Sequence, residues 1–196
     1  MKKQVNIALF ASGSGSNVEN IHNYFREKSD INISCVLCNN KDAYVLTRAS
    51  LLNLDFLLFN RSEFNESDKI LHFLDSKNID LIVLAGFLWL IPDYLIKKYS
   101  NRIINIHPAL LPKYGGRGMY GDRVHIAVYE NRELESGITI HYVNGEYDEG
   151  EIIAQYRVGI DPNEGPDSIA DKVHGLEYKY YPIEIEKLAV NLQHEH

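Results

Sequence analysis

Cysteine is scarce in this chain, and it has neither a surplus of basic residues nor a long apolar run. Two of the 196 residues are cysteine, too few for a disulfide framework. The net charge of −7 at pH 7 argues against a general nucleic-acid-binding or membrane-surface role. No apolar run approaches the ~20 residues of a membrane-spanning helix, and the N-terminal residues lack a signal peptide's apolar region. We therefore expect a cytoplasmic protein that binds neither nucleic acid nor membrane.

The two cysteines, Cys35 and Cys38, have C-x-x-C spacing. They lie in an apolar stretch, 31–38, whose composition predicts a strand. On a strand, residues three apart face opposite sides of the sheet, so the two thiols cannot converge on one metal ion. No second cysteine pair is available to complete a zinc site. We predict two buried, reduced thiols and no metal site.

Apolar stretches alternate with segments of helical spacing through the first half of the chain. The predicted strands cover 5–11, 31–37, 56–59 and 79–85 and begin again at 103, and the predicted helices cover 18–28, 43–52 and 64–76 and begin again at Pro92. Such alternation favours right-handed crossovers and a parallel sheet with helices on both faces.

The C-terminal half is organised differently. A helix is predicted at 122–130, then two strands at 137–143 and 151–158 whose short connection indicates an antiparallel pair, and then an amphipathic helix at 168–192 that Pro182 can break. No linker, repeat or low-complexity segment divides the chain. The sequence therefore predicts one α/β domain over residues 1–196, with a doubly wound, mostly parallel, Rossmann-like sheet and antiparallel strands added in its C-terminal half.

A glycine-rich turn follows the first predicted strand, with the sequence Gly13-Ser14-Gly15-Ser16-Asn17. A strand, such a turn and a helix together aim free backbone N–H groups at an anion, and Ser16 or Asn17 can cap the helix. The motif is shorter than G-x-G-x-x-G and no Walker lysine follows it, so a single phosphate fits better than a dinucleotide or ATP. A plain turn is the alternative.

The strand that begins at Ile103 stops abruptly at Pro108 because proline cannot donate to a sheet ladder. Asn105 and His107 are two apart and therefore share one face of this strand. They lie at its C-terminal end, where open α/β sheets bind ligands. The amide can hydrogen-bond an oxyanion and the imidazole can move a proton. Taken alone, the pair also fits a polar strand end without chemistry.

Two further loops and one histidine are weaker candidates for a functional role. The apolar stretch 87–91 is either tucked into the core or forms a wall for a flat aromatic ligand. The glycine-rich loop that ends at Gly121 carries Lys113 and Arg117, and it is equally consistent with a lid, an anion contact or a mere connector. His125, on the helix 122–130, is a type of residue that is more often structural than catalytic.

Together, these motifs resemble the folate-dependent formyltransferases, and among them the phosphoribosylglycinamide formyltransferases of purine biosynthesis. The Asn-x-His-Pro-x-Leu-Leu-Pro string is specific to the wider superfamily, and the phosphate turn and the chain length narrow the choice. The matching pieces run in order over nearly the whole chain, at 13–17, 85–87, 105–114, 136–143 and 147–153, with Glu177 before Tyr181 and Pro182.

The resemblance implies a role for each matched residue. Asn105, His107 and Asp148 would be catalytic; Gly13, Ser14, Gly15, Ser16, Asn17 and Glu177 would bind phosphoribosylglycinamide; and Leu88, Trp89, Leu90, Ile91, Asn105, Asn144 and Asp148 would bind folate. Glu177 would hold the ribose hydroxyls. The implied co-substrate is 10-formyltetrahydrofolate, with no metal, and the expected assembly is a monomer or a homodimer.

The implied reaction is direct attack of the substrate amine on the formyl carbon. Asn105 and protonated His107 would stabilise the charge that grows on the formyl oxygen, a contribution often worth ~3 kcal/mol per donor. His107 and a water positioned by Asp148 would relay the proton to the leaving folate nitrogen, and Asp148 would favour the charged imidazole.

Three positions depart from the family pattern. No arginine follows Phe64, and Trp89 stands where many members carry an arginine, which makes this wall more apolar. The turn at Lys113 continues with Tyr-Gly-Gly rather than Tyr-Pro-Gly, and its loop is longer.

Related activities are the alternatives. A methionyl-tRNA formyltransferase would normally add a domain for tRNA, a formyltetrahydrofolate hydrolase would normally carry a regulatory domain, and a sugar-nucleotide formyltransferase would need a nucleotide site. A non-catalytic ligand-binding module on the same fold is the rival from another class.

Overall fold

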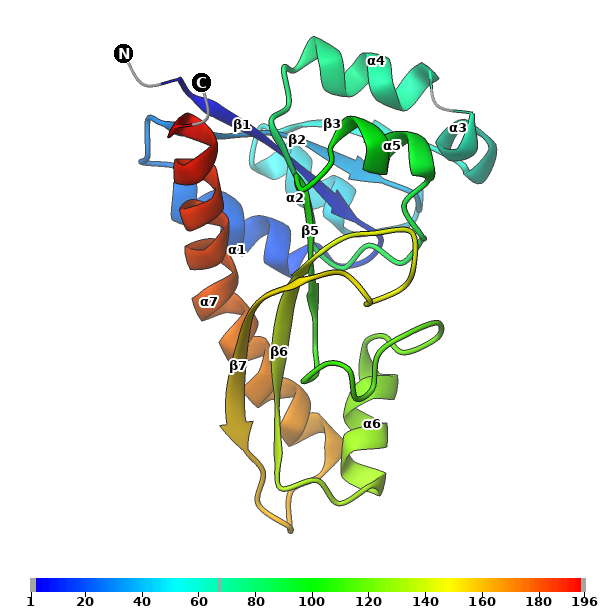
Figure 1. Ribbon diagram of the computed structural model, residues 1–196, viewed down its shortest axis with the longest axis vertical. Helices are drawn as coiled ribbons and strands as arrows, with labels where there is room; N and C mark the ends of the chain where they lie inside the picture. Colours follow the sequence, from blue (N-terminus) through cyan, green and yellow to red (C-terminus); the bar gives the residue numbers. More distant parts are fainter. Residues whose placement is uncertain (1–2, 67, 195–196) are drawn as a thin grey trace.

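A seven-stranded sheet in the order β3-β2-β1-β4-β5-β6-β7 organises the computed structural model, which describes residues 3–66 and 68–194 (Figure 1). The strands are β1 (Val5–Ala11), β2 (Ile31–Cys38), β3 (Asp55–Leu58), β4 (Leu81–Leu84), β5 (Ile103–His107), β6 (Glu135–Tyr142) and β7 (Ile152–Gly159). The pairs among β1 to β5 are parallel, and β6 joins β5 and β7 in antiparallel pairs. The predicted fold class is confirmed.

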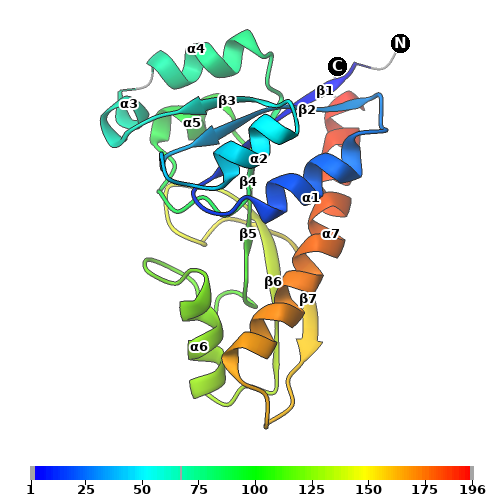
Figure 2. The same cartoon turned by 180° about the vertical axis from the view of Figure 1, so that it is seen from behind.

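Helices cover both faces of the sheet, as Figures 1 and 2 show from opposite sides. They are α1 (Ser16–Phe25), α2 (Val45–Leu51), α3 (Arg61–Asn65), α4 (Asp68–Ser76), α5 (Asp93–Lys98), α6 (Asp122–Glu130) and α7 (Pro166–His194). Alternate residues of β1 belong to two different cores, one on each face of the sheet. Ile7 and Leu9 join the core formed with α1, α2, α6 and α7, whereas Ala8 and Phe10 join the core formed with α3, α4 and α5. Because both faces are covered, β1 is a continuous apolar run rather than an alternating one.

The helix predicted at 64–76 proves to be two helices, α3 and α4, with residue 67 between them outside the described residues. The prediction missed the start of α3, which Asn60 caps. The Asn60 side chain accepts the N–H of Glu63 at 3.0 Å, and the Glu63 carboxylate accepts the N–H of Asn60 at 2.8 Å. This capping box satisfies two donors and begins the helix ahead of Phe64, the first residue of the periodic pattern.

Pro182 does not break the last helix. α7 is continuous and extends beyond the predicted 168–192 at both ends, with Pro182 buried inside it. An interior proline costs a helix ~3 kcal/mol. The neighbouring side chains of Tyr181 and Ile185 are fully buried in the core, and burial of such side chains contributes ~1.5–3 kcal/mol each. Packing therefore outweighs the penalty.

The prediction of two buried, reduced thiols is confirmed, since Cys35 and Cys38 are both buried free thiols. Burial raises the pKa of the Cys35 thiol to about 12. Within 3–66 and 68–194, no three or more side chains of the types that bind metals are grouped to hold an ion. No helix in those same ranges combines the length and apolar character needed to span a membrane.

Strand pairing brings the predicted site segments to one edge of the sheet. β4 lies beside β5 with Leu84 next to Asn105, and β6 runs antiparallel to β5 with His141 opposite Asn105 and Thr139 opposite His107. The loops after β1, β4 and β5 therefore meet at this edge, where parallel sheets place their ligands. The loop between β6 and β7 starts near the other end of β5 and reaches the same edge with Asp148.

Candidate active site

A cleft of about 590 Å³ opens where these loops meet. Its lining comes from the turn 13–17, the loop 84–91, the end of β5 and the glycine-rich loop 116–121, together with residues of α6, α7 and the loop before β7. Every predicted site residue lies in this lining except Asn144. The Asn144 side chain instead accepts the N–H of Glu146 at 3.0 Å, so it shapes the loop that carries Asp148.

The glycine-rich turn ends at the first helical turn of α1. Gly15 precedes the helix with φ +77, and a Cβ there would lie 2.5 Å from the Cγ2 of Val45. Only glycine fits this position without strain. No side chain caps α1, which differs from the expectation that Ser16 or Asn17 would do so. The N–H groups of the first turn remain available to an anion.

The Asn17 side chain turns instead toward α7. Its Nδ2 donates to Glu177 Oε2 at 2.9 Å, while its buried Oδ1 has no partner among the residues that the structure describes. Glu177 is 7% exposed, and burial raises the pKa of its carboxyl, with Asn17 and His174 acting in the opposite direction. The pair joins two helices distant in sequence and brings Glu177 beside the phosphate turn.

Two histidines also line this end of the cleft, and the sequence analysis missed one of them. The rings of His125 and His174 lie 6.0 Å apart. Burial lowers the pKa of His125, and His174 adds to that effect. His174 lies three residues before Glu177, and residues three apart share a helix face. That spacing could have indicated from the sequence that His174 lies beside Glu177.

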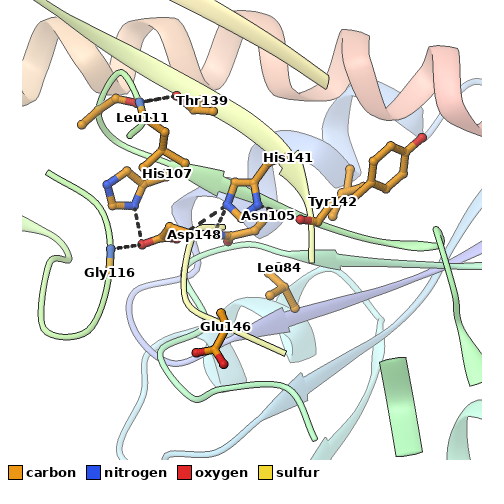
Figure 3. A network of polar contacts seen from close by, with 12 residues as sticks. Leu84, Asn105, His107, Leu111, Gly116, Thr139, His141, Tyr142, Glu146 and Asp148 are labelled. Atoms are coloured by element: carbon orange, nitrogen blue, oxygen red, sulfur yellow. Dashed lines mark hydrogen bonds and ion pairs between the residues drawn. The ribbon is translucent and has the colours of Figure 1, made fainter. Parts of the chain in front are cut away.

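The three predicted catalytic residues come together. Asp148 Oδ2 lies 3.4 Å from His107 Nδ1, and Asn105 Nδ2 donates to Asp148 Oδ1 at 3.5 Å (Figure 3). The His107 and Asp148 side chains are 4% and 11% exposed. Asp148 has φ +58, a conformation that costs a non-glycine residue ~1 kcal/mol or more. Strain of this kind persists where the surroundings fix the residue.

A fourth polar side chain, His141, belongs to the same network and was not predicted. Its Nδ1 lies 2.8 Å from the Tyr142 carbonyl oxygen, which can only accept, so Nδ1 carries a proton. Its Nε2 lies 3.2 Å from Asn105 Nδ2 and 3.6 Å from Asp148 Oδ1. Nε2 therefore faces both the Asn105 amide and the Asp148 carboxylate. Knowing that β6 pairs antiparallel with β5 would have revealed this contact.

The loop after β5 closes over the catalytic residues. The Tyr114 carbonyl oxygen accepts the Nε2–H of His107 at 2.7 Å, and the Gly116 N–H donates to Asp148 Oδ2 at 2.9 Å (Figure 3). With Nε2 donating to Tyr114, the nitrogen that faces Asp148 is Nδ1. The loop thus selects which ring nitrogen is free to exchange a proton.

The charges of His107 and Asp148 follow from opposing effects. Burial lowers the pKa of His107, and the Asp148 carboxylate and Tyr114 carbonyl only partly oppose this. Asp148 acts in the expected direction, but the net shift favours a neutral imidazole rather than the expected protonated one. For Asp148, burial raises the pKa, but contacts with His141, His107 and the Gly116 N–H outweigh it, so the carboxyl pKa is lowered. Asp148 is therefore ionised beside a neutral imidazole.

The apolar loop after β4 fits both of its sequence interpretations. Phe87 and Ile91 are buried in the core, whereas Leu88 and Leu90 are 45% and 37% exposed and line the cleft. Trp89 packs against the rings of Phe59, Phe64 and Phe87. The Arg61 guanidinium lies 4.4 Å from the Trp89 ring centroid. One wall of the cleft is therefore apolar and firmly packed.

Comparison with known proteins shows which family this chain belongs to. The model of the formyl transferase family matches residues 5–185, a range that includes all seven strands and every predicted site residue. The chain belongs to the formyl transferase family.

Two relatives of this chain, one bacterial and one from a plant, are both named phosphoribosylglycinamide formyltransferase. The Bacillus subtilis protein is 36% identical over 195 residues, which cover 96% of this chain and 95% of the relative. The chloroplastic protein of Arabidopsis thaliana is 39% identical over 181 residues, or 89% of this chain. This chain spans 62% of the length of the Arabidopsis protein.

Solved structures of proteins with the same name share the fold of this formyl transferase. The structure from Anaplasma phagocytophilum matches with a TM-score of 0.86 and 30% identity, covering 96% of this chain and 89% of that one. The structure from Coxiella burnetii, a complex with CHES, also has a TM-score of 0.86, with 33% identity over the same shares.

Proposed function

We propose that this chain is a phosphoribosylglycinamide formyltransferase that moves the formyl group of 10-formyltetrahydrofolate to the amine of 5′-phosphoribosylglycinamide in de novo purine biosynthesis. The observation that carries the proposal is that Asn105, His107 and Asp148 meet in one cleft with the turn 13–17, which leads into a helix whose start no side chain caps. The names of the relatives and solved structures support the same reaction.

The cleft offers a distinct subsite for each part of the two substrates. The phosphate would bind the free N–H groups at the start of α1, and the ribose hydroxyls would bind Glu177. The flat ring of the folate would lie along Leu88 to Ile91. These placements put the substrate amine and the formyl carbon beside the end of β5, within reach of Asn105 and His107.

The chemistry is a proton transfer coupled to direct attack. The amine nitrogen forms a bond to the formyl carbon, and charge grows on the formyl oxygen, where the Asn105 amide can donate. Neutral His107 accepts the amine proton at Nδ1, and ionised Asp148 stabilises the resulting imidazolium. The carbon–nitrogen bond to folate then breaks, and the imidazolium returns the proton, directly or through a water held by Asp148, to the leaving folate nitrogen.

The remaining expectations extend this proposal. The 196 residues would form one catalytic domain, working in the cytoplasm as a monomer or homodimer on small-molecule substrates, without a metal ion and without binding nucleic acid or membrane. Folate is consumed as a co-substrate rather than held as a permanent group.

An acceptor assay tests the reaction. The purified chain is supplied with 10-formyltetrahydrofolate and with phosphoribosylglycinamide, a sugar-nucleotide amine or water alone, and loss of the formyl group is followed by folate absorbance. We expect rapid transfer only with phosphoribosylglycinamide. Equal loss in water alone would instead identify a hydrolase, and folate binding without turnover on any acceptor would identify a binding module.

A further inference from the structure

A carboxylate outside the cleft holds the loop segment that contacts the catalytic histidine. The Glu133 Oε1 atom accepts from the Tyr114 hydroxyl at 2.9 Å and from Lys113 Nζ at 2.7 Å. Hydrogen bonds from Lys113 and Tyr114 lower the pKa of the Glu133 carboxyl, so Glu133 is ionised. Glu133 is itself anchored, since its N–H donates to the Val128 carbonyl at the end of α6 at 3.2 Å.

The backbone held by Glu133 has a conformation that needs support. Tyr114 has φ +58, in the left-handed region that non-glycine residues seldom adopt. The next residue, Gly115, lies in close packing, because a Cβ there would be 2.5 Å from Leu111 Cδ2. The Tyr114 carbonyl group therefore belongs to a segment with an unusual backbone conformation and little room around it.

The direction of this carbonyl matters to the reaction. The same Tyr114 oxygen accepts Nε2–H of His107 at 2.7 Å, which leaves His107 Nδ1 facing Asp148 at 3.4 Å. A displaced carbonyl would release Nε2 and let the ring turn or adopt the other tautomer. Glu133 lines a second cavity of about 230 Å³ rather than the catalytic cleft, so its influence on the ring passes through the segment of Lys113 and Tyr114 that it holds.

We propose that Glu133 is a positioning residue for His107, acting through Tyr114. By holding the Tyr114 hydroxyl, Glu133 fixes the main-chain carbonyl that selects the tautomer and orientation of the imidazole. This inference rests on the proposed role of His107 in formyl transfer. It assigns a role to a side chain that touches neither substrate nor the reacting atoms.

Two variants test whether Glu133 acts on His107 through Tyr114. Glu133→Ala removes the acceptor, and Tyr114→Phe removes only the hydroxyl that it holds. Each should lower kcat by about fivefold, the rate equivalent of one net hydrogen bond, while KM for both substrates stays within about twofold. The double variant should be no slower than either single one, because both changes break the same link. Glu133→Gln, which keeps an oxygen acceptor, should recover most of the rate.

The pH profile separates positioning from a merely structural effect. The Tyr114 carbonyl raises the pKa of His107, so losing its alignment should move the acid limb of kcat to lower pH in both variants. Glu135→Ala is the matched control: Glu135 lies two residues away and pairs with Arg157, and its loss should leave kcat and the limb unchanged.

Distinct outcomes overturn the inference or its premise. Additive losses in the double variant, a silent Tyr114→Phe, or lower thermal stability with an unmoved acid limb would each remove the proposed role of Glu133. If Glu133→Ala does not fold, Tyr114→Phe alone decides. Normal turnover by His107→Ala would remove the role of His107 and with it the Glu133 inference, whereas absence of formyl transfer by the unchanged chain would overturn the proposed function itself.

Discussion

The proposed phosphate end of the cleft, at the turn 13–17, and its proposed catalytic end, at Asn105, His107 and Asp148, differ in what holds their functional groups. At the phosphate end, the donors are main-chain N–H groups, and a glycine at φ +77 aims them where one strand leads into one helix. At the catalytic end, Asn105 and Asp148 are 43 residues apart in sequence, and His107 is held by a carbonyl from a separate loop. Backbone geometry governs the first region and a side-chain network governs the second.

This difference predicts two kinds of failure. A change at the phosphate end should weaken substrate binding and stability, because the turn is part of the fold. A change in the catalytic network should lower kcat with little effect on stability, because buried polar groups there serve the reaction rather than the core. The following predictions test that contrast in order of expected size.

His107→Ala should produce the largest effect. Losing the group that relays the proton should lower kcat by ~10²–10⁴-fold, while the thermal midpoint shifts by only a few degrees. Steady-state folate absorbance and thermal unfolding measure the two quantities. His72→Ala is the control, because His72 is exposed on α4 and should leave kcat unchanged. Near-normal kcat in His107→Ala, or loss of its fold, would contradict the expectation that changes in the catalytic network lower kcat with little effect on stability.

Gly15→Ala should act through binding and stability together. The new Cβ would meet Val45 Cγ2 at 2.5 Å and sit at φ +77, so we expect a loss of ~1–3 kcal/mol in unfolding free energy. We also expect at least a tenfold rise in KM for phosphoribosylglycinamide, because the first-turn N–H groups shift.

Gly159→Ala is a matched glycine control outside the cleft. A Cβ at Gly159 would meet nothing within 4 Å, so stability and KM should both stay close to those of the unchanged chain. Denaturant unfolding and substrate titration compare the two variants. Equal behaviour of the two glycine variants would mean that close packing at Gly15 does not shape the phosphate site.

The pH dependence of kcat should report on the catalytic end alone. His107 must be neutral to accept a proton, and burial holds its pKa below 6.5. Activity should therefore be full at neutral pH and fall as the pH drops through that pKa. Asp148 raises the pKa of His107, so Asp148→Asn should lower kcat and move this acid limb to still lower pH. A limb that moved upward would contradict the assigned charges.

The contrast also explains what sequence could and could not predict. The strand–turn–helix unit with Gly15 is contiguous, so local chemistry was enough to predict a phosphate turn, and Asn105 and His107 were adjacent on one predicted strand. The contacts of His141 depend on the pairing of β5 with β6, and that pairing is a long-range feature that local periodicity does not encode.

The same limit applies to other details. Asp148 could be singled out only by resemblance, because a loop carboxylate carries no local signal of burial. The continuity of α7 through Pro182 came from core packing, which outweighs a residue's intrinsic preference. The start of α3 ahead of Phe64 is set by a capping box that the apolar spacing alone did not reveal.

A substitution at the apolar wall should have the smallest effect on activity and stability, because several contacts hold Trp89 in place. Trp89 packs against three phenylalanine rings, and Arg61 adds one exposed cation–π contact at 4.4 Å, worth ~0.5–1 kcal/mol. Arg61→Ala should therefore lower the unfolding free energy by no more than that amount and change the folate KM by less than about twofold. Arg61→Lys, which keeps the positive charge, is the matched comparison. A large rise in folate KM for Arg61→Ala alone would mean that the guanidinium contacts the co-substrate itself. The apolar wall would then depend on a single polar contact, as the catalytic network does.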